Sequence, residues 1–289
     1  FREFATPASE PFEIAFDMIT RTAEELLNSA AQQGLPAPAL VSAAVGGPLD
    51  IGKGIIYSPP HLPTWTGIPI KAHLHEHFHL PVFVEHDGNA CALAEFYFGA
   101  GRGAKNIIYL TLGTGLGAGI IINGKIYRGT TDLAGEVGHI RMAEDGPVEH
   151  GKAGSWEGFC SASGMVKLAH MRFPGYWQPD VNPRQIIQQA LDGDTKARKL
   201  VEEMGIWLGK GLAMLVDILN PEIIIAGTLG VLLGDLLLEP ARQVVREEAL
   251  PQTAQACKII PAQLGSKVAS ASWRRLMGVV AQPVCIMGR

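Results

Sequence analysis

The chain has 289 residues, of which 47% are apolar and 18% are charged, and its formal net charge is −4. This length is enough for two domains of ordinary size, and the composition is normal for a folded soluble protein. Lysine and arginine form no cluster typical of a nucleic-acid groove, so we expect no nucleic acid to bind through this chain. No apolar run reaches the roughly 18 residues of a membrane span. The four cysteines are scattered, as free thiols are in a reducing cytoplasm, so we expect a cytoplasmic protein that avoids membranes.

The first third of the chain predicts two helices, two strands and a third helix. Apolar residues recur at helical spacing after Pro11 and up to Gly34. Residues 55–69 are rich in proline and glycine and indicate a loop. The other expected elements are the strands Leu40–Val45 and Pro81–Glu85 and the helices Ile70–Phe78 and Asn89–Phe98. Glycines over residues 99–103 indicate a flexible joint, so we expect a smaller domain over residues 1–98 and a larger one over 99–289.

In the rest of the chain, strands again alternate with helices. Asn123-Gly124 suits the two left-handed positions of a tight hairpin turn. The expected strands are Asn106–Leu112, Gly117–Ile122, Lys125–Tyr127, Glu222–Ala226 and Lys258–Pro261. The expected helices are Asp194–Leu219, Leu232–Glu248 and a terminal helix after the last strand, and residues 281–289 match no element. The alternation predicts an α/β fold with mixed sheets.

The strongest local signal is a glycine-rich run from Thr111 to Gly119, placed between two predicted strands. Its glycines carry no side chains, so backbone N–H groups can approach an anion closely, and Thr114 adds a hydroxyl. The run is neither a Walker loop nor a Rossmann fingerprint, because it lacks Gly-Lys-Ser/Thr and opens no helix. It is either a hairpin that holds phosphates or a turn without a ligand.

Three further segments carry groups that suit a ligand. Asp87 follows a predicted strand, where it either takes a proton from a hydroxyl or caps the next helix. Glu136 and His139 lie three residues apart around a glycine, and they either accept hydrogen bonds from vicinal hydroxyls or are solvated surface groups. The strand and turn over residues 223–230 suit the adenosine or phosphate part of a nucleotide, as do many turns that bind nothing.

Four histidines between His73 and His79 share helix faces in pairs. A zinc site needs three or four converging ligands, and the sequence offers no evident partner from elsewhere. We interpret this run as a solvated helix face.

Taken in order, these segments resemble the ROK family of bacterial sugar kinases and sugar-responsive repressors, from about Ala39 to about Gly230 and more loosely to Gln263. The resemblance implies two actin-like (ribonuclease H-like) domains of the sugar kinase/Hsp70/actin superfamily that close on a cleft, ATP and Mg²⁺ as cofactors, and a homodimer. It implies Asp87 as the catalytic base. The sugar-binding positions that it implies are Gly47, His61, His86, Glu136, His139 and Glu157. The nucleotide-binding positions that it implies are Gly113, Thr114, Gly115, Gly117, Gly227, Thr228 and Leu229.

Three departures separate the chain from the kinase pattern of this family. The family opens with an Asp-x-Gly-Gly-Thr loop that contacts the ATP phosphates, and this chain, which begins at Phe1, has no such segment. The family's zinc motif aligns with residues 148–157, where Val148, His150 and Ser155 replace three cysteines, so we predict no structural zinc. His61 and His86 stand where the family usually has sugar-binding asparagines, which leaves the sugar preference open.

We therefore expect an ATP-dependent kinase that acts on a hydroxyl of a hexose or N-acetylhexosamine, with Asp87 as the general base. One alternative is a sugar-binding regulator, or a degenerate ROK protein, without kinase activity. Another is a cleft that binds something other than a hexose. Sequence ahead of Phe1 would discriminate among them, because an Asp-x-Gly-Gly-Thr hairpin favours the kinase and a basic helix-turn-helix favours the regulator.

Overall fold

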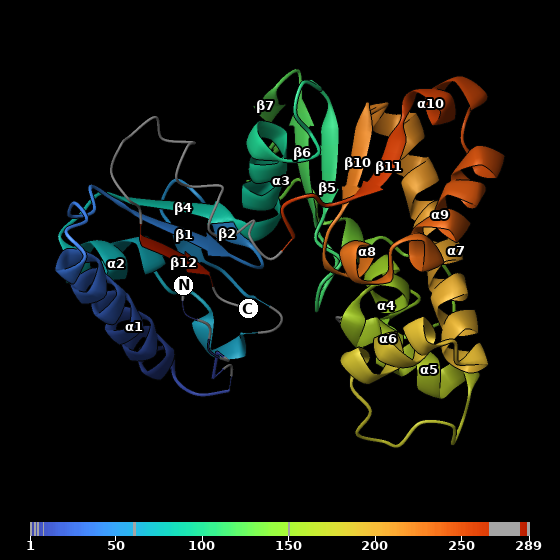
Figure 1. Ribbon diagram of the computed structural model, residues 1–289, viewed down its shortest axis with the longest axis horizontal. Helices are drawn as coiled ribbons and strands as arrows, with labels where there is room; N and C mark the ends of the chain where they lie inside the picture. The colour runs from blue at the N-terminus through green and yellow to red at the C-terminus, as the bar shows by residue number, and fades with distance from the viewer. Residues whose placement is uncertain are drawn as a thin grey trace.

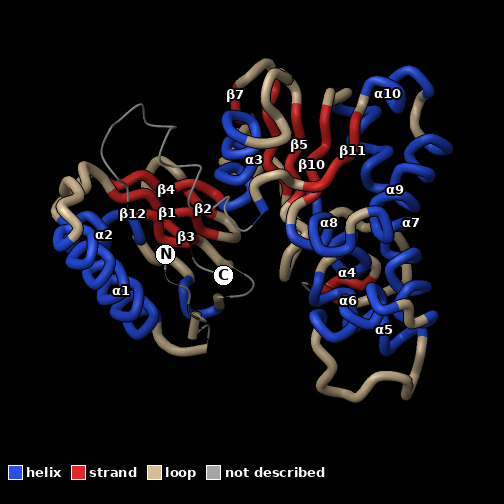
Figure 2. Tube along the Cα trace, viewed as in Figure 1, coloured by secondary structure: helices blue, strands red, loops and turns tan. Residues whose placement is uncertain are grey.

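The computed structural model describes residues 2, 4, 6, 7, 9–59, 62–149 and 151–265 and the backbone of 284–287. In these residues the chain builds two main sheets, each with its own helices, and two short two-stranded hairpins (Figures 1 and 2). No helix in this described part combines the length and the apolar character that a membrane span requires. The predicted His61 and the His150 of the zinc motif lie outside the described residues.

The first sheet has three parallel strands. In spatial order they are β12 (Val284–Met287), β1 (Val41–Val45) and β4 (Val82–His86). Strand β1 is buried along its whole length, as expected of a central parallel strand covered on both faces. Helices α1 (Phe12–Gln32) and α2 (Ile70–Phe78) lie beside this sheet in Figure 1. Buried side chains of α1, α2, β1 and β4 form one core cluster.

The second sheet has five strands and is mixed. In spatial order they are β11 (Lys258–Pro261), β10 (Ile223–Ala226), β5 (Ile107–Leu110), β6 (Ala118–Ile122) and β7 (Lys125–Ile126). Strands β5, β10 and β11 are parallel, whereas β6 and β7 are antiparallel to their neighbours. Asn123 and Gly124 have φ of 51° and 75°, so the predicted turn is confirmed.

Most of the remaining helices pack around the second sheet. They are α3 (Asp87–Phe98), α4 (Trp156–Cys160), α5 (Ala162–Arg172), α6 (Pro183–Asp192), α7 (Thr195–Leu219), α8 (Thr228–Leu233), α9 (Asp235–Glu248) and α10 (Pro251–Ala256). The small elements are the hairpins β2 (Leu49–Asp50) with β3 (Ile55–Ile56) and β8 (Val148–Glu149) with β9 (Lys152–Ala153), and the 3₁₀ turns η1 (Pro63–Trp65) and η2 (Val137–His139). The largest core cluster of the described residues lies among these helices and the second sheet.

Helix α3 connects the two sheets. It begins directly after β4 of the first sheet and packs against β6 and β5 of the second. A Cβ on Gly119 would overlap the carbonyl oxygen of Gly88, so the backbones of β6 and α3 touch at two glycines. This packing places the end of β4 beside the start of β6. The predicted boundary between two domains at residues 98 and 99 stays a prediction. Helix α3, from the first predicted domain, packs on the second sheet, and β12, from the second predicted domain, pairs in the first sheet.

Several predicted elements differ from those observed. The predicted helix Leu232–Glu248 is wrong as a single element, because Gly234, with φ of 52° and ψ of −131°, separates α8 from α9. The predicted loop over residues 55–69 contains β3 and η1. Residues 284–287, for which no element was predicted, form β12. The predicted terminal helix lies outside the described residues.

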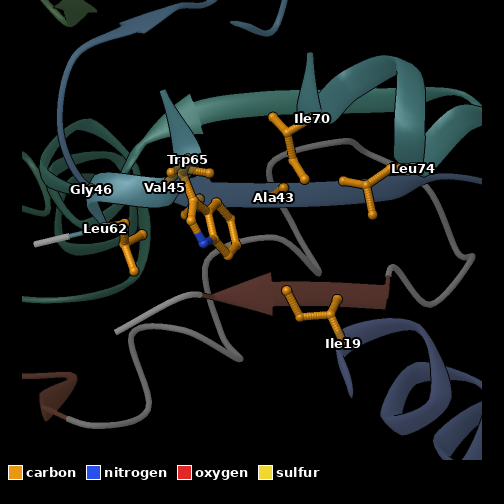
Figure 3. Close-up of a pocket in the computed structure, with 9 residues that line it drawn as sticks. Ile19, Ala43, Val45, Gly46, Leu62, Trp65, Ile70 and Leu74 are labelled. Atoms are coloured by element: carbon orange, nitrogen blue, oxygen red, sulfur yellow. The ribbon is translucent and has the colours of Figure 1, made fainter. Parts of the chain in front are cut away.

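A small cavity of about 20 Å³ lies beside β1, and Figure 3 shows Trp65 among the side chains that line it. Its lining is aliphatic and aromatic and consists of Ile19, Ala43, Ala44, Val45, Gly46, Leu62, Trp65, Ile70 and Leu74. Such a volume holds about one water molecule. It is too small for a sugar, so the candidate site lies elsewhere.

Candidate functional site

The carboxyl ends of β1 and β4 place Asp87 beside two glycines. The strands are parallel, with Val45 opposite His86, so the residues that follow them meet at one edge of the sheet. A Cβ on Gly46 would lie 3.2 Å from Asp87 Oδ2, and Gly47 has a left-handed φ of 95°. The carboxylate of Asp87 therefore lies over the turn that leaves β1.

His86 lies between Asp87 and Glu136. Its Nδ1 is 3.5 Å from Asp87 Oδ1, and its Nε2 is 3.7 Å from Glu136 Oε1. The imidazole is 12% exposed, while the two carboxylates are each about a third exposed. A protonated imidazole donates from both nitrogens and a neutral one from only one. The predicted base and a predicted sugar ligand thus face a shared imidazole.

A partly buried ion pair joins the end of β4 to the loop that carries Glu136. The side chain of Glu85 is 6% exposed and pairs with Arg128, which follows β7. Glu85 Oε1 also accepts hydrogen bonds from the backbone N–H of His86 at 3.1 Å and from Asn89 Nδ2 at 3.0 Å. Sequence reasoning missed this pair, although an acidic residue at the end of an apolar strand was a usable signal.

The loop of Glu136 fits against the glycine-rich run through glycines of its own. Gly135 has φ of 103°, and a Cβ there would overlap the carbonyl oxygen of Ala118. A Cβ on Gly138 would likewise overlap the carbonyl oxygen of Leu116. His139 ends η2 with an exposed side chain, and its backbone carbonyl accepts a hydrogen bond from Lys152 Nζ. Gly-Glu-Val-Gly-His needs its two glycines because backbone packs on backbone here.

Glu157 reaches the same region from the buried face of α4. Its Oε2 accepts a hydrogen bond of 2.8 Å from the backbone N–H of Leu116. The same oxygen would lie 3.2 Å from a Cβ on Gly138. Glu157 therefore contacts both the loop of Glu136 and the glycine-rich run.

The glycine-rich run forms the connection between β5 and β6. Thr111 closes its base, because Thr111 Oγ1 accepts from Gly117 N at 2.9 Å and Thr111 N donates to Gly117 O at 3.0 Å. At its tip, the carbonyl groups of Gly113 and Thr114 accept hydrogen bonds from the first turn of α5. The N–H groups of Thr114 and Gly115 donate to none of the residues that the structure describes. Because the carbonyls at the tip are already hydrogen-bonded and the N–H groups of Thr114 and Gly115 can donate, the tip is suited to bind an anion.

The predicted adenosine positions lie against this run. The N–H of Gly227 donates to Leu110 O at 2.8 Å, and that of Leu229 donates to Leu112 O at 3.1 Å. A Cβ on Gly113 would lie 3.8 Å from Thr228 Oγ1. All seven predicted nucleotide positions are therefore in one connected region.

The glycine-rich run also reaches the carboxylates. A Cβ on Gly117 would lie 3.9 Å from Cε1 of His86, which itself faces Asp87 and Glu136. Apart from His61, which lies outside the described residues, the predicted sugar-binding and nucleotide-binding positions lie at or next to the carboxyl ends of β1 and β4 and on turns and short helices next to the β5–β6 connection. The arrangement can bind a polyhydroxylated molecule next to an anion.

Comparison with known proteins agrees with this geometry. The ROK family profile matches residues 2–272. The chain belongs to the ROK family. The glucokinase of Halalkalibacterium halodurans is 34% identical over 241 residues, which cover 78% of this chain and 73% of that protein. The xylose repressor of Caldicellulosiruptor bescii is 33% identical over 219 residues, 72% of this chain and 55% of the repressor, so this ROK chain spans about half of that relative.

A solved structure is similar over most of the chain. The crystal structure of a ROK family glucokinase from Streptomyces griseus in complex with glucose and AMPPNP matches with a TM-score of 0.79 and 31% identity, covering 92% of this chain and 87% of that one. The predicted family and the predicted actin-like α/β fold class are confirmed. ROK relatives include both sugar kinases and repressors, so membership supports either a sugar kinase or a regulator.

The zinc motif of the ROK family does not fit this chain. Val148 is aliphatic and 53% exposed, and it cannot ligate a metal. Ser155 is buried at the N-terminus of α4, where its Oγ accepts a hydrogen bond of 3.1 Å from Gly158 N. Among the described residues, no three His, Cys, Asp or Glu side chains cluster in a way that could hold a metal ion. Val148 and Ser155 thus leave two of the motif's three cysteine positions without a side chain suited to zinc.

Proposed function

We propose that this ROK protein transfers the γ-phosphoryl group of ATP to a hydroxyl of a hexose or N-acetylhexosamine. The observation that carries the proposal is the pair of contacts of His86 with Asp87 and Glu136, next to a glycine-rich connection with two available N–H donors. A base and an anion site must adjoin for phosphoryl transfer to a hydroxyl.

In this proposal, Asp87 is the catalytic base. Its carboxylate is 36% exposed, so a substrate hydroxyl can reach it and lose its proton as the oxygen attacks phosphorus. Glu136 accepts hydrogen bonds from other sugar hydroxyls, and His86 aligns the two carboxylates. The remaining sugar ligands are Gly47, His61, His139 and Glu157.

Glu157 has a second role in the proposal. One of its oxygens is held by the N–H of Leu116, so its orientation depends on the glycine-rich run. A carboxylate fixed in this way favours one arrangement of sugar hydroxyls over others. The same bond links the sugar side of the site to the phosphate side.

The N–H groups of Thr114 and Gly115 would bind phosphate oxygens, while Gly227, Thr228 and Leu229 would border the adenosine. Mg²⁺ arriving with the nucleotide would neutralise charge on the phosphates. The proposed partners are accordingly one sugar, one nucleotide and a second copy of the chain.

A sugar-responsive regulator is the second candidate, and the similarity to a xylose repressor favours it. In a regulator, the same carboxylates would bind a sugar, and no phosphoryl group would be transferred to it. The two candidates differ in turnover and in nucleotide binding.

Calorimetry and a coupled ADP-release assay with the same panel of sugars test the proposal. The panel is glucose, mannose, N-acetylglucosamine, N-acetylmannosamine and xylose, each with and without ATP and Mg²⁺. We expect heat and turnover with at least one hexose or N-acetylhexosamine. Heat without turnover would support the regulator, and no heat from any sugar would contradict the sugar site itself.

A further inference from the structure

An ion pair connects α5 to residues that align with the ROK zinc motif, which spans residues 148–157. Lys167 on α5 lies 2.7 Å from Glu149 Oε1, and its Nζ donates to the carbonyl of Val148 at 2.8 Å. The side chain of Glu149 is 9% exposed. A carboxylate this deeply buried needs a cation or several donors near it. Lys167 therefore ties the β8–β9 hairpin to α5, in a segment whose donor set does not suit zinc.

The same carboxylate connects to the tip of the glycine-rich run through one hydroxyl. Ser163 Oγ lies 3.0 Å from Glu149 Oε1 and 2.9 Å from the carbonyl oxygen of Thr114. A hydroxyl has one proton, which these two acceptors share, and Ser161 Oγ lies 3.0 Å away as a further partner. Lys167 on α5 is therefore connected to the carbonyl of Thr114 through Glu149 and Ser163.

The direction of these bonds determines which groups of the tip face outward. The carbonyl of Gly113 accepts from Ala162 N at 2.8 Å, and that of Thr114 accepts from Ser163 N at 3.4 Å. With its carbonyls held by α5, the peptide at the tip presents its N–H groups on the other side. Those are the N–H groups of Thr114 and Gly115 that bind phosphate in the proposed function.

We propose that Glu149 and Lys167 are positioning residues for nucleotide binding, and that their ion pair holds β8 against α5 without a metal. The nucleotide part rests on the proposed function. Loss of the Lys167 charge would leave the Glu149 carboxylate to draw the Ser163 proton away from Thr114. Loss of the Glu149 charge would release β8 from α5, so either change would disturb the hold of α5 on Thr114. Sugar binding would change less than nucleotide binding, because Asp87, His86 and Glu136 do not contact Glu149 or Lys167. Of the proposed sugar ligands, His139 adjoins this hairpin, through its backbone carbonyl and Lys152.

The test compares Lys167→Met and Glu149→Gln with the control Lys199→Met. Lys199 is exposed on α7 and forms no ion pair with any residue that the structure describes. Calorimetry would measure the Kd of AMPPNP and of the sugar for each protein, and steady-state kinetics would measure the two KM values. We expect both test variants to weaken AMPPNP about tenfold, the size of one charge-assisted hydrogen bond, with sugar Kd within about twofold.

Two further measurements separate this inference from the proposed function. Trypsin should cleave after Lys152 faster in Lys167→Met than in the control, and dialysis of the wild type against EDTA should leave its Tm unchanged. Unchanged AMPPNP affinity in both variants would overturn the positioning role. A fall of Tm with EDTA, or equal cleavage after Lys152, would overturn the metal-free hold of β8 on α5. A wild type that binds no nucleotide would contradict the proposed function and the nucleotide part of this inference together.

Discussion

Removal of Arg128 should destabilise the protein by leaving a buried carboxylate without its cation. Breaking a fully buried ion pair in this way costs about 3–5 kcal/mol. Here Arg128 is 35% exposed, and Glu85 keeps its hydrogen bonds from His86 N and Asn89 Nδ2. Because solvent and these two donors offset part of the loss, we expect Arg128→Met to lower the free energy of unfolding by about 2 kcal/mol.

A double-mutant cycle isolates the pair. Glu85→Gln, Arg128→Met and the double variant would be unfolded in urea, with the exposed Arg102→Met as the control. The free energy of unfolding of the double variant should fall by about 1 kcal/mol less than the sum of the two single losses. The reason is that the glutamine of Glu85→Gln would carry no buried charge that loses its partner when Arg128 is removed. Additive losses, or a loss in Arg128→Met no larger than in Arg102→Met, would refute the reasoning.

Three further predictions concern backbone fit, helix capping and thiol reactivity. Gly135→Ala should lower the free energy of unfolding by about 2–4 kcal/mol in urea, since its Cβ meets Ala118 O, whereas Gly34→Ala, also at positive φ but in open space, should lose about 1 kcal/mol. Hydrogen bonds from Tyr176 and then from Ala197 N lower the pKa of Asp194, the N-cap of α7. The contribution of the ionised carboxylate to the free energy of unfolding is therefore complete above the ordinary carboxyl pKa of 3.8, and it disappears as pH falls through the lower folded value. Asp194→Ala should cost about 1 kcal/mol at pH 7 and little at pH 2, whereas Asp194→Asn keeps a capping oxygen and should cost less. Burial raises the pKa of the Cys257 thiol to about 11, so its alkylation by iodoacetamide, followed by peptide mass spectrometry, should rise about tenfold per pH unit from pH 8 to 10, and a plateau by pH 9 would contradict this environment.

Local signals in the sequence were enough for many elements. Pro69 and the left-handed His79 bracket α2, whose bounds match the prediction, and Asn123-Gly124 marks the β6–β7 turn. The single helix predicted after residue 232 failed because the apolar period continues through Gly234, whose backbone conformation breaks it. Strand β12 was missed because four residues carry too short a pattern without knowledge of β1 beside them.

The candidate site was only partly accessible to sequence reasoning. The resemblance to ROK proteins named Asp87 and Glu136, but His86 was expected only as one sugar ligand, whereas it faces both carboxylates. Contacts such as Glu85–Arg128 join residues far apart in the chain, and no local pattern encodes them. Such contacts come from the packing of α3 on β6, which brings the two sheets together.

The most direct measurement is the turnover of Asp87→Asn, with sugar binding determined on the same preparation. Asparagine keeps the shape of the side chain but cannot accept the proton of the attacking hydroxyl. We predict that kcat falls by about two to four powers of ten while the sugar still binds within about tenfold of the wild type. Turnover equal to that of the wild type would contradict the assignment of Asp87 as the base and, with it, the proposed phosphoryl transfer at this site.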